Sequence, residues 1–210
     1  MGPSGTGKSV TLKHIIGLHR ADRGRVLVDG QDVARLDAKG LTTLRRSIGY
    51  LFQEGALLAG LTVGENVALP LRELTDLPDA EIRARVRRTL ALVKLEEAFD
   101  RYPGVLSGGM RKRVGLARAL ISSPRIVLYD EPNSGLDPRT SREVNQLILR
   151  VRDTLGVSCV VVTHHLDCAL TVGDRIALLE AGKFVAQGTP PEFRDSRDPK
   201  VRSFFGWTET

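Results

Sequence analysis

The chain has 210 residues, enough for one domain or for one domain that carries an inserted subdomain. It is 41% hydrophobic and 27% charged, as a globular protein is, and no apolar run approaches the roughly 18 residues of a membrane-spanning helix. Two cysteines are too few for a disulfide framework, and 31 basic against 25 acidic residues give a net charge of +6 that selects no partner by itself.

The chain opens on a glycine-rich loop that leads into a helix. Residues 2–9 read G-P-S-G-T-G-K-S and match the phosphate-loop pattern G-x-x-x-x-G-K-S. Glycines let backbone amides close around phosphate oxygens, and the helix directs its positive N-terminal end at the same anion. We expect Lys8 to reach the β- and γ-phosphates of a nucleotide and the Ser9 hydroxyl to ligate Mg²⁺. The residues expected to bind the nucleotide are Gly2, Pro3, Ser4, Gly5, Thr6, Gly7, Lys8, Ser9 and Val10.

Only Met1 precedes this loop. A phosphate loop is normally held between a preceding strand and a following helix. We therefore expect the N-terminal strand of the sheet to be missing from this chain. The apolar side of the helix after the loop is expected to include Val10, Leu12, Ile15 and Ile16.

Two short strands are expected next, at 25–29 and 47–52, with a turn at Asp29-Gly30 after the first. From Thr62 to about Leu120 the pattern becomes helical, and one helix begins at Pro78-Asp79. Its buried stripe is expected to consist of Ile82, Val86, Leu90 and Val93. This block, about 54–122, is the candidate for an inserted helical subdomain.

A continuous apolar strand at 125–129 ends at the acidic pair Asp130-Glu131. The carboxyl ends of buried strands are where α/β sheets bind their ligands. We expect Asp130 to hold Mg²⁺, through water. Glu131 is expected to orient and polarise an attacking water, the positioning role that phosphoryl transfer asks of a protein.

The remaining pattern predicts a helix at 141–154, a second buried strand at 157–163, and a hairpin of 175–180 and 183–187 around Ala181-Gly182. Buried strands that alternate with helices indicate an α/β fold with a mainly parallel sheet covered on both faces. The tail, about 190–210, ends with Phe204, Phe205 and Trp207, which either pack onto the domain as a short helix or dock on another subunit.

The segment Leu106-Ser107-Gly108-Gly109-Met110 resembles the signature sequence of ABC ATPases. Ser107 is a good N-cap, and the glycines after it expose helix amides to an anion. The resemblance extends, in order and spacing, over essentially the whole chain. Gln53 matches the Q-loop of that family, Asp137 of S-G-L-D matches its D-loop, and His164 matches its switch histidine.

This resemblance implies one P-loop NTPase domain over 1–210, with a RecA-like, mainly parallel sheet and an inserted ABC α-helical subdomain. It implies a head-to-tail homodimer with ATP and Mg²⁺ held between the copies, in which Ser107, Gly108 and Gly109 bind the ATP of the partner subunit. Lys8, Glu131 and His164 would be catalytic. Ser9, Gln53 and Asp130 would hold Mg²⁺, while Gln53 would also link to an integral membrane permease and Asp137 would communicate across the dimer.

Three features depart from the family pattern. His165 replaces the usual acidic residue after the switch histidine, so either His164 or His165 is the switch, and alignment with the preceding strand favours His164. Met110 stands where glutamine is common. The family also uses an aromatic residue, N-terminal to the phosphate loop, that stacks on adenine, an interaction worth roughly 1–3 kcal/mol in comparable sites; we expect it to be missing with the strand.

Several stretches resemble the ATPases of Mla/Mce-type lipid transporters: 55–58 with 61–67, the signature ending in Met110, 156–162, and 198–205. This favours phospholipid transport at the cytoplasmic face of the inner membrane, with a permease and an Mce-type lipid-binding subunit as partners. The alternatives are the ATPase of a polar amino-acid importer, a soluble ABC ATPase that acts on DNA or ribosomes, and a regulatory module without turnover. No nucleic-acid partner is expected, because no stacking aromatics interleave the basic clusters at 83–88 and 111–113.

Overall fold

A computed structural model describes residues 1–206, and Trp207 therefore lies outside the described residues. The strands of the described part are β1 (Leu27–Val28), β2 (Gln31–Asp32), β3 (Ile48–Leu51), β4 (Ile126–Asp130), β5 (Ser158–Val162), β6 (Ile176–Glu180) and β7 (Lys183–Gly188). The α-helices are α1 (Lys8–Ile15), α2 (Ala38–Arg46), α3 (Val63–Leu74), α4 (Asp79–Leu92), α5 (Gly108–Leu120), α6 (Pro138–Leu155), α7 (Leu166–Val172), α8 (Pro190–Arg194) and α9 (Pro199–Phe205). Short 3₁₀ helices are η1 (Val33–Arg35), η2 (Glu96–Ala98) and η3 (Pro103–Val105). Among residues 1–206, no helix is both long enough and apolar enough to cross a membrane.

The strand that ends at the acidic pair lies at the centre of the main sheet. This sheet is parallel and has the order β3-β4-β5. Within residues 1–206, β1 pairs with β2 and β6 with β7 in separate antiparallel pairs. The expected parallel arrangement of the central strands is therefore confirmed.

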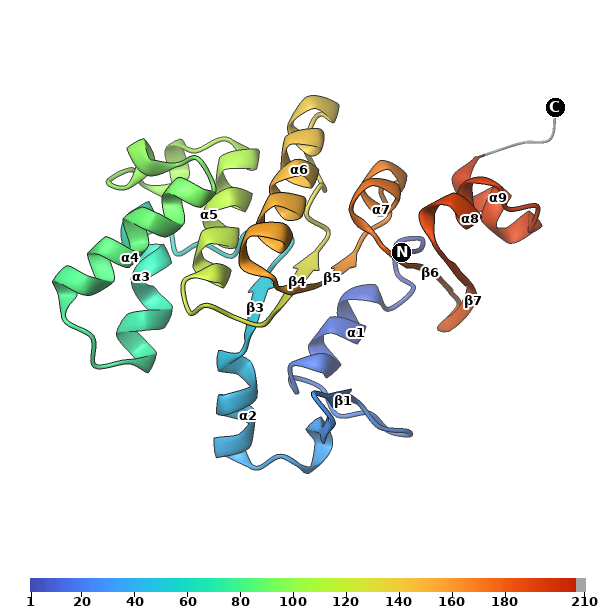
Figure 1. Cartoon of the computed structure of the whole chain (residues 1–210), viewed down its shortest axis with the longest axis horizontal. Helices are drawn as coiled ribbons and strands as arrows, with labels where there is room; N and C mark the ends of the chain where they lie inside the picture. The colour runs from blue at the N-terminus through green and yellow to red at the C-terminus, as the bar shows by residue number, and fades with distance from the viewer. Residues whose placement is uncertain (207–210) are drawn as a thin grey trace.

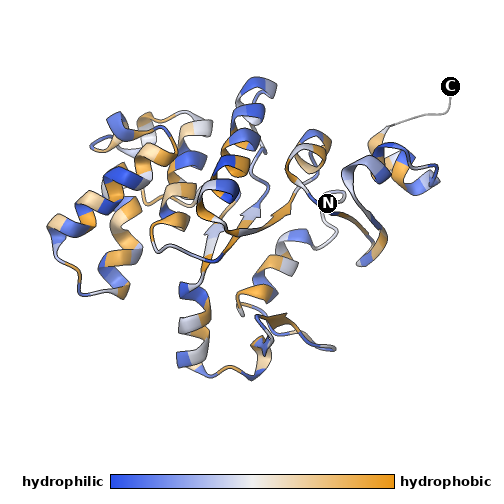
Figure 2. Cartoon of the chain, viewed as in Figure 1, coloured by the Kyte–Doolittle hydropathy of each residue, from blue (hydrophilic) through white to orange (hydrophobic). Residues whose placement is uncertain are grey.

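Helices cover both faces of this sheet. Successive side chains of a strand point to opposite faces, so β4 contributes to a hydrophobic cluster on each side. Val127 and Tyr129 of β4 belong to one hydrophobic cluster, which α3, α4, α5 and α6 complete. Leu128 belongs to a second cluster, together with Leu12 and Ile16 of α1. Figure 1 shows α6 and α1 on opposite sides of the strands, and Figure 2 shows hydrophobic residues gathered along them.

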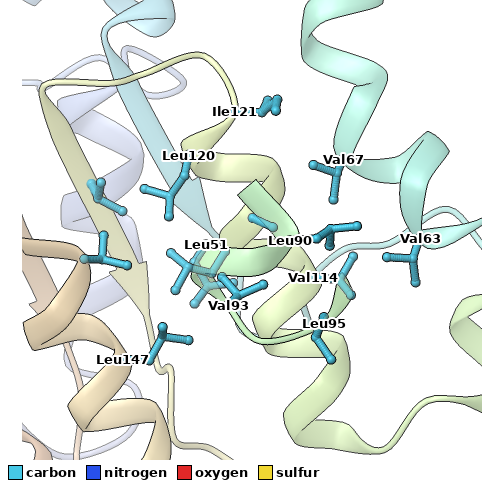
Figure 3. Close-up of a cluster of buried hydrophobic side chains, with 14 of the residues drawn as sticks. Leu51, Val63, Val67, Leu90, Val93, Leu95, Val114, Leu120, Ile121 and Leu147 are labelled. Atoms are coloured by element: carbon cyan, nitrogen blue, oxygen red, sulfur yellow. The ribbon is translucent and has the colours of Figure 1, made fainter. Parts of the chain in front are cut away.

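The helices α3, α4 and α5 pack together at one end of the molecule (Figure 1). The expected stripe of α4 is confirmed, since Ile82, Val86, Leu90 and Val93 are all buried. Figure 3 shows Leu90 and Val93 beside Leu51 of β3, so the same cluster joins the helical block to the sheet.

Three local expectations need correction. Val10 does not belong to the buried side of α1: it is 46% exposed, because at about 3.6 residues per turn it lies on the opposite side from Leu12 and Ile16. β5 is not fully buried: Val160 is 39% exposed, because one side of this strand faces a cavity of about 610 Å³ between β5 and β6. The turn Asp29-Gly30 is followed at once by β2, which was not expected.

The C-terminal helices pack onto the hairpin of β6 and β7. Val201 and Phe205 of α9 are buried in a cluster with Phe193 of α8 and Ile176 of β6. The ring of Phe204 meets that of Phe205 edge-on, with centroids 5.7 Å apart. For Phe205, the interpretation as a helix that packs onto the domain is therefore the one that the structure supports.

Candidate functional site

The glycine-rich loop is fixed between the ends of β5 and β6. The amide of Gly2 donates to Thr163 O, and Met1 O accepts from the amide of Leu179. A Cβ on Gly2 would lie 2.2 Å from Leu179 O, so only glycine fits there. Gly5 and Gly7 have φ of 83° and 93°, a left-handed conformation that glycine adopts without strain.

Helix α1 begins at Lys8, with Gly7 as its N-cap and no side-chain cap hydrogen bond. Its first amides, together with the positive end of the helix dipole, are available to an anion. The loop and the start of α1 thus form the phosphate cradle that the sequence predicts.

Lys8 is buried although it is charged. Its Nζ donates to Gly2 O and to Pro3 O, each at 2.9 Å, and lies 3.3 Å from Oε1 of Glu131. The ammonium therefore lies between the loop and the acidic end of β4, where it can exchange carbonyl acceptors for the oxygens of a phosphate.

Ser9 and Asp130 meet at the same edge of the sheet. The Ser9 hydroxyl donates to Oδ1 of Asp130 at 2.6 Å, and the Tyr50 hydroxyl of β3 donates to Oδ2 at 3.0 Å. Burial, together with the charge and the hydrogen bond of Asp130, raises the pKa of Tyr50 above its ordinary value, so its phenol stays protonated and donates. A hydroxyl and a carboxylate this close are the hard oxygen ligands that Mg²⁺ takes, so these residues fit the ion.

Glu131 contacts the other two residues of the expected catalytic set. Its Oε2 lies 2.9 Å from Nδ1 of His164, and its Oε1 faces Lys8. Burial favours the neutral carboxyl, but the hydrogen bonds and charge of His164 and the charge of Lys8 outweigh it, so the pKa of Glu131 lies below its ordinary value. The carboxylate is therefore ionised and able to accept a proton or a hydrogen bond from water.

The backbone of Glu131 is strained. Its φ is 48°, a left-handed conformation that costs a residue other than glycine on the order of 1–3 kcal/mol. Its amide donates to Val162 O at 2.9 Å. Such strain persists only where the surroundings hold it, and it often marks functional sites.

The two adjacent histidines occupy different environments. His164 reaches Glu131, whereas His165 is the N-cap residue of α7 and its amide donates to the Thr163 hydroxyl. The rings are 4.4 Å apart. Burial and the neighbouring charge of His164 lower the pKa of His165. The structure therefore brings His164, and not His165, to the acidic end of β4.

The signature segment lies at the N-terminus of α5, against the N-terminus of α6. Ser107 caps α5 by accepting from the amide of Met110, and Asp137 caps α6 by accepting from the amides of Arg139 and Thr140. A hydrogen bond from the Thr140 hydroxyl, together with those from the two amides, lowers the pKa of Asp137. Among the contacts of residues 1–206, no hydrogen bond or ion pair joins Ser107, Gly108 or Gly109 to the phosphate loop.

Gln53 is the expected Mg²⁺ ligand that, within residues 1–206, no hydrogen bond connects to Ser9 or Asp130. It follows β3 with its side chain exposed, and within the described part of the chain that side chain makes no hydrogen bond. The backbone just after it is held by Arg118 of α5, which donates to Gly55 O and Ala56 O, each at 2.8 Å.

Two features of this site are not predicted from the sequence. One is the role of Tyr50. Its position near the carboxyl end of the expected strand 47–52 is a usable signal, because ligands of α/β sheets bind at the carboxyl ends of strands. Asn133 and Asn145 form a buried chain: Nδ2 of Asn133 donates to Oδ1 of Asn145, whose Nδ2 donates to Asp167 of α7, each at 3.0 Å. No local pattern distinguishes such asparagines from exposed ones.

Replacing Gly109 by Ala tests the contact between α5 and α6. The new Cβ would lie 2.6 Å from Cγ2 of Thr140, which must then move away from the cap at Asp137. We expect urea unfolding to show a loss of about 1–3 kcal/mol, as overpacking typically costs. The control is Gly104→Ala, where nothing lies within 4 Å and a change within about 0.5 kcal/mol is expected. Equal free energies of unfolding for Gly109→Ala and Gly104→Ala would contradict this expectation, because Thr140 would then move aside without destabilising the fold.

Comparison with known proteins gives a consistent result. A family model described as "ABC transporter" matches residues 1–134. The probable ribonucleotide transport ATP-binding protein mkl of Mycobacterium tuberculosis is 45% identical over 204 residues, which are 97% of this chain and 57% of that protein. The methionine import ATP-binding protein MetN of Xylella fastidiosa is 45% identical over 210 residues, 100% of this chain and 62% of that protein. The chain thus spans less than two thirds of the length of these relatives.

Two solved structures have the same architecture. The dimeric, post-hydrolysis state of the ATP-binding cassette MJ0796 bound to ADP and Pi has a TM-score of 0.82 and 37% identity, over 90% of this chain and 83% of that one. The structure of cbiO1 from Clostridium perfringens, part of the ABC transporter complex cbiONQ, has a TM-score of 0.84 and 29% identity, over 98% of this chain and 85% of that one.

Proposed function

This chain belongs to the ABC transporter family, and from that premise we propose that it is the ATP-hydrolysing part of a membrane transporter. The expected α/β P-loop NTPase fold of an ABC cassette is confirmed by the family match and the structural likenesses. The observation that carries the proposal is the cluster at the end of β4, where Lys8, Glu131 and His164 meet beside the paired Ser9 and Asp130.

Each residue of this cluster has a chemical role in the proposal. The loop amides and Lys8 bind the phosphates of ATP, with Lys8 releasing its carbonyl acceptors. Ser9, Asp130 and Gln53 would hold Mg²⁺, which would supply positive charge to the transferred phosphoryl group. Glu131 orients the attacking water, and His164 moves from Glu131 toward the γ-phosphate. Positioning and electrostatic stabilisation then supply the rate enhancement.

The active form is proposed to be a head-to-tail homodimer. Within residues 1–206, no hydrogen bond or ion pair joins Ser107, Gly108 or Gly109 to the phosphate loop of their own chain, which agrees with a role at the ATP of the partner subunit. Asp137, next to them at the start of α6, would communicate between the copies. The subdomain of about 54–122 and Gln53 would contact an integral permease at the cytoplasmic face of the membrane.

The proposed cargo is a phospholipid or another lipid. Its support is the resemblance of 55–58, 61–67, 156–162 and 198–205 to the ATPases of Mla/Mce-type systems, in which an Mce-type lipid-binding subunit is a further partner. The second candidate is amino-acid import, because the methionine import protein MetN is 45% identical over the whole chain. A third candidate cargo is a ribonucleotide, because mkl is described as a probable ribonucleotide transport protein. One experiment addresses all three cargoes.

Purification from the native membrane would distinguish these cargoes. We expect the protein to co-purify with an integral permease, an Mce-type subunit and bound phospholipid, and to hydrolyse ATP. If a soluble amino-acid-binding protein co-purified in place of the Mce-type subunit, the inferred cargo would be an amino acid. The proposal that the chain is an ATPase would stay intact. Absence of Mg²⁺-dependent ATP hydrolysis in the purified complex would contradict the ATPase itself and favour a regulatory module.

A further inference from the structure

Lys112 is a buried cation that the proposed chemistry does not use. It lies on α5 and is 5% exposed. Its Nζ donates to the backbone carbonyl of Glu131 at 3.0 Å and to Oγ of Ser134 at 3.2 Å. Burial lowers the pKa of Lys112, while the charges of Glu54 and Glu131 oppose that shift. A buried ammonium must be hydrogen-bonded, and here both of its acceptors belong to the turn after β4.

Hydrogen bonds fix both the amide and the carbonyl of Glu131, the strained residue of the site. The amide of Glu131 donates to Val162 O, and its carbonyl accepts from Lys112 and from the amide of Ser134. With its amide and its carbonyl both fixed, the left-handed backbone of Glu131 directs the carboxylate toward Lys8 and His164. Without Lys112, that carbonyl keeps only the short-range bond from Ser134.

Helix α5 connects this turn to two other parts of the proposed machinery. Ser107 caps its N-terminus, one to two turns before Lys112. Arg118, nearer its C-terminus, binds the carbonyls of Gly55 and Ala56 just after Gln53. Gly115 lies between them against the same loop, since a Cβ there would come 3.0 Å from Cα of Gly55. A helix moves as a rigid element, so displacement of its N-terminus is passed to both contacts.

We propose that Lys112 is a positioning residue that fixes the catalytic direction of Glu131 and makes it depend on the position of α5. The inference rests on the proposed function, because it assigns Ser107 and the glycines after it to the ATP of the partner subunit. Engagement of that ATP by the N-terminus of α5 in one copy then adjusts, through Lys112, the carboxylate that acts on the ATP of its own phosphate loop. Hydrolysis at the two sites of the dimer is coupled in this way.

The test replaces Lys112 by Met, which keeps the length and apolar stem of the side chain and removes its hydrogen-bond donors. We expect kcat for ATP hydrolysis to fall about 10- to 100-fold, the size of effect that a small misplacement of a reacting group produces. KM should stay within about threefold, because ATP binding does not use Lys112. Lys112→Arg, which restores a donor, should recover part of the rate.

Amide exchange in the nucleotide-free protein gives a readout that needs no activity. In Lys112→Met, we expect faster hydrogen–deuterium exchange in residues 131–135 and unchanged exchange in α4. The control is Lys39→Met: Lys39 is exposed on α2 and its ammonium makes no hydrogen bond or ion pair within residues 1–206, so neither exchange nor kcat should change. Ser134→Ala removes one acceptor without burying a new group, and it should accelerate exchange in the same segment to a smaller extent.

The outcomes separate the two proposals. If the wild-type protein hydrolyses no ATP, the proposed function fails, while the exchange data still decide whether Lys112 holds the turn. Unchanged exchange at 131–135 in Lys112→Met and in Ser134→Ala overturns the positioning role. A parallel loss of ATP binding and turnover, with exchange accelerated throughout α5 and α6, also overturns it, because Lys112 would then support packing alone. If Lys112→Met does not fold, the exchange of Ser134→Ala decides.

Discussion

Replacing Glu131 by Gln is expected to lower the steady-state rate of ATP hydrolysis by about 10²–10⁴-fold, the usual contribution of a positioned acid or base. Gln keeps the size of the side chain and can still accept from Nδ1 of His164, but it cannot take a proton from water. The phosphate loop, Lys8, and the pair of Ser9 and Asp130 stay in place. ATP should therefore still bind, and the measurement is phosphate release at saturating ATP alongside calorimetric binding.

The matched control for this variant is Glu180→Gln. Glu180 is an exposed carboxylate at the end of β6, and it forms no ion pair within residues 1–206. Its variant should hydrolyse ATP at the wild-type rate. Normal turnover by Glu131→Gln would remove Glu131 from the mechanism, and loss of ATP binding would show instead that the carboxylate is needed to hold Lys8 in the loop.

Replacing Lys8 by Ala is expected to weaken ATP binding itself. The ammonium lies between the loop carbonyls and Glu131, and Ala leaves that buried position without a cation. Removing one partner of a buried, hydrogen-bonded charge pair costs about 2–5 kcal/mol, which corresponds to about 30- to 4,000-fold in Kd. The site would also carry one more uncompensated negative charge, which repels the triphosphate.

Calorimetric titration with ATP measures this change, and Lys13→Ala is its control. Lys13 lies on the same helix, and within the described residues its ammonium makes no ion pair, so ATP affinity should be unchanged. Thermal unfolding of both variants checks that α1 stays folded. An unchanged Kd in a folded Lys8→Ala variant would contradict the assignment of the loop as a phosphate cradle.

Much of the fold and of the site could be predicted because the features concerned are local. The glycine pattern around Lys8 predicts a phosphate loop that leads into a helix, and the structure has such a loop, with Gly5 and Gly7 at positive φ. The spacing of the apolar residues in α4 predicts the face that becomes buried. In each case the constraint, such as a steric limit or a helical period, acts among a few neighbouring residues, so a short stretch of sequence is enough to predict it.

The same kind of reasoning was wrong where burial depends on distant neighbours. An apolar stretch such as that of β5 predicts a strand, but the exposure of Val160 depends on whether another strand lies beside it. Val10 was assigned to the buried side of α1 because it is apolar, whereas the position of the sheet selects Leu12 and Ile16. The hydrophobic effect is non-directional, so an apolar residue can be predicted as a candidate for the core, but the residues that it packs against cannot.

The sequence by itself determined which residue types are available for chemistry: a phosphate loop with Lys8 and Ser9, and the acidic pair at the end of a buried strand. The sequence already favoured His164 over His165. Only the tertiary structure decided that His164 contacts Glu131, that Tyr50 completes the hydrogen bonds of Asp130, and that Lys112 holds the Glu131 backbone. These contacts join segments far apart in the chain. They form because parallel packing brings the carboxyl ends of β3, β4 and β5 to one edge and α5 packs against this sheet, an arrangement that no short window of sequence contains.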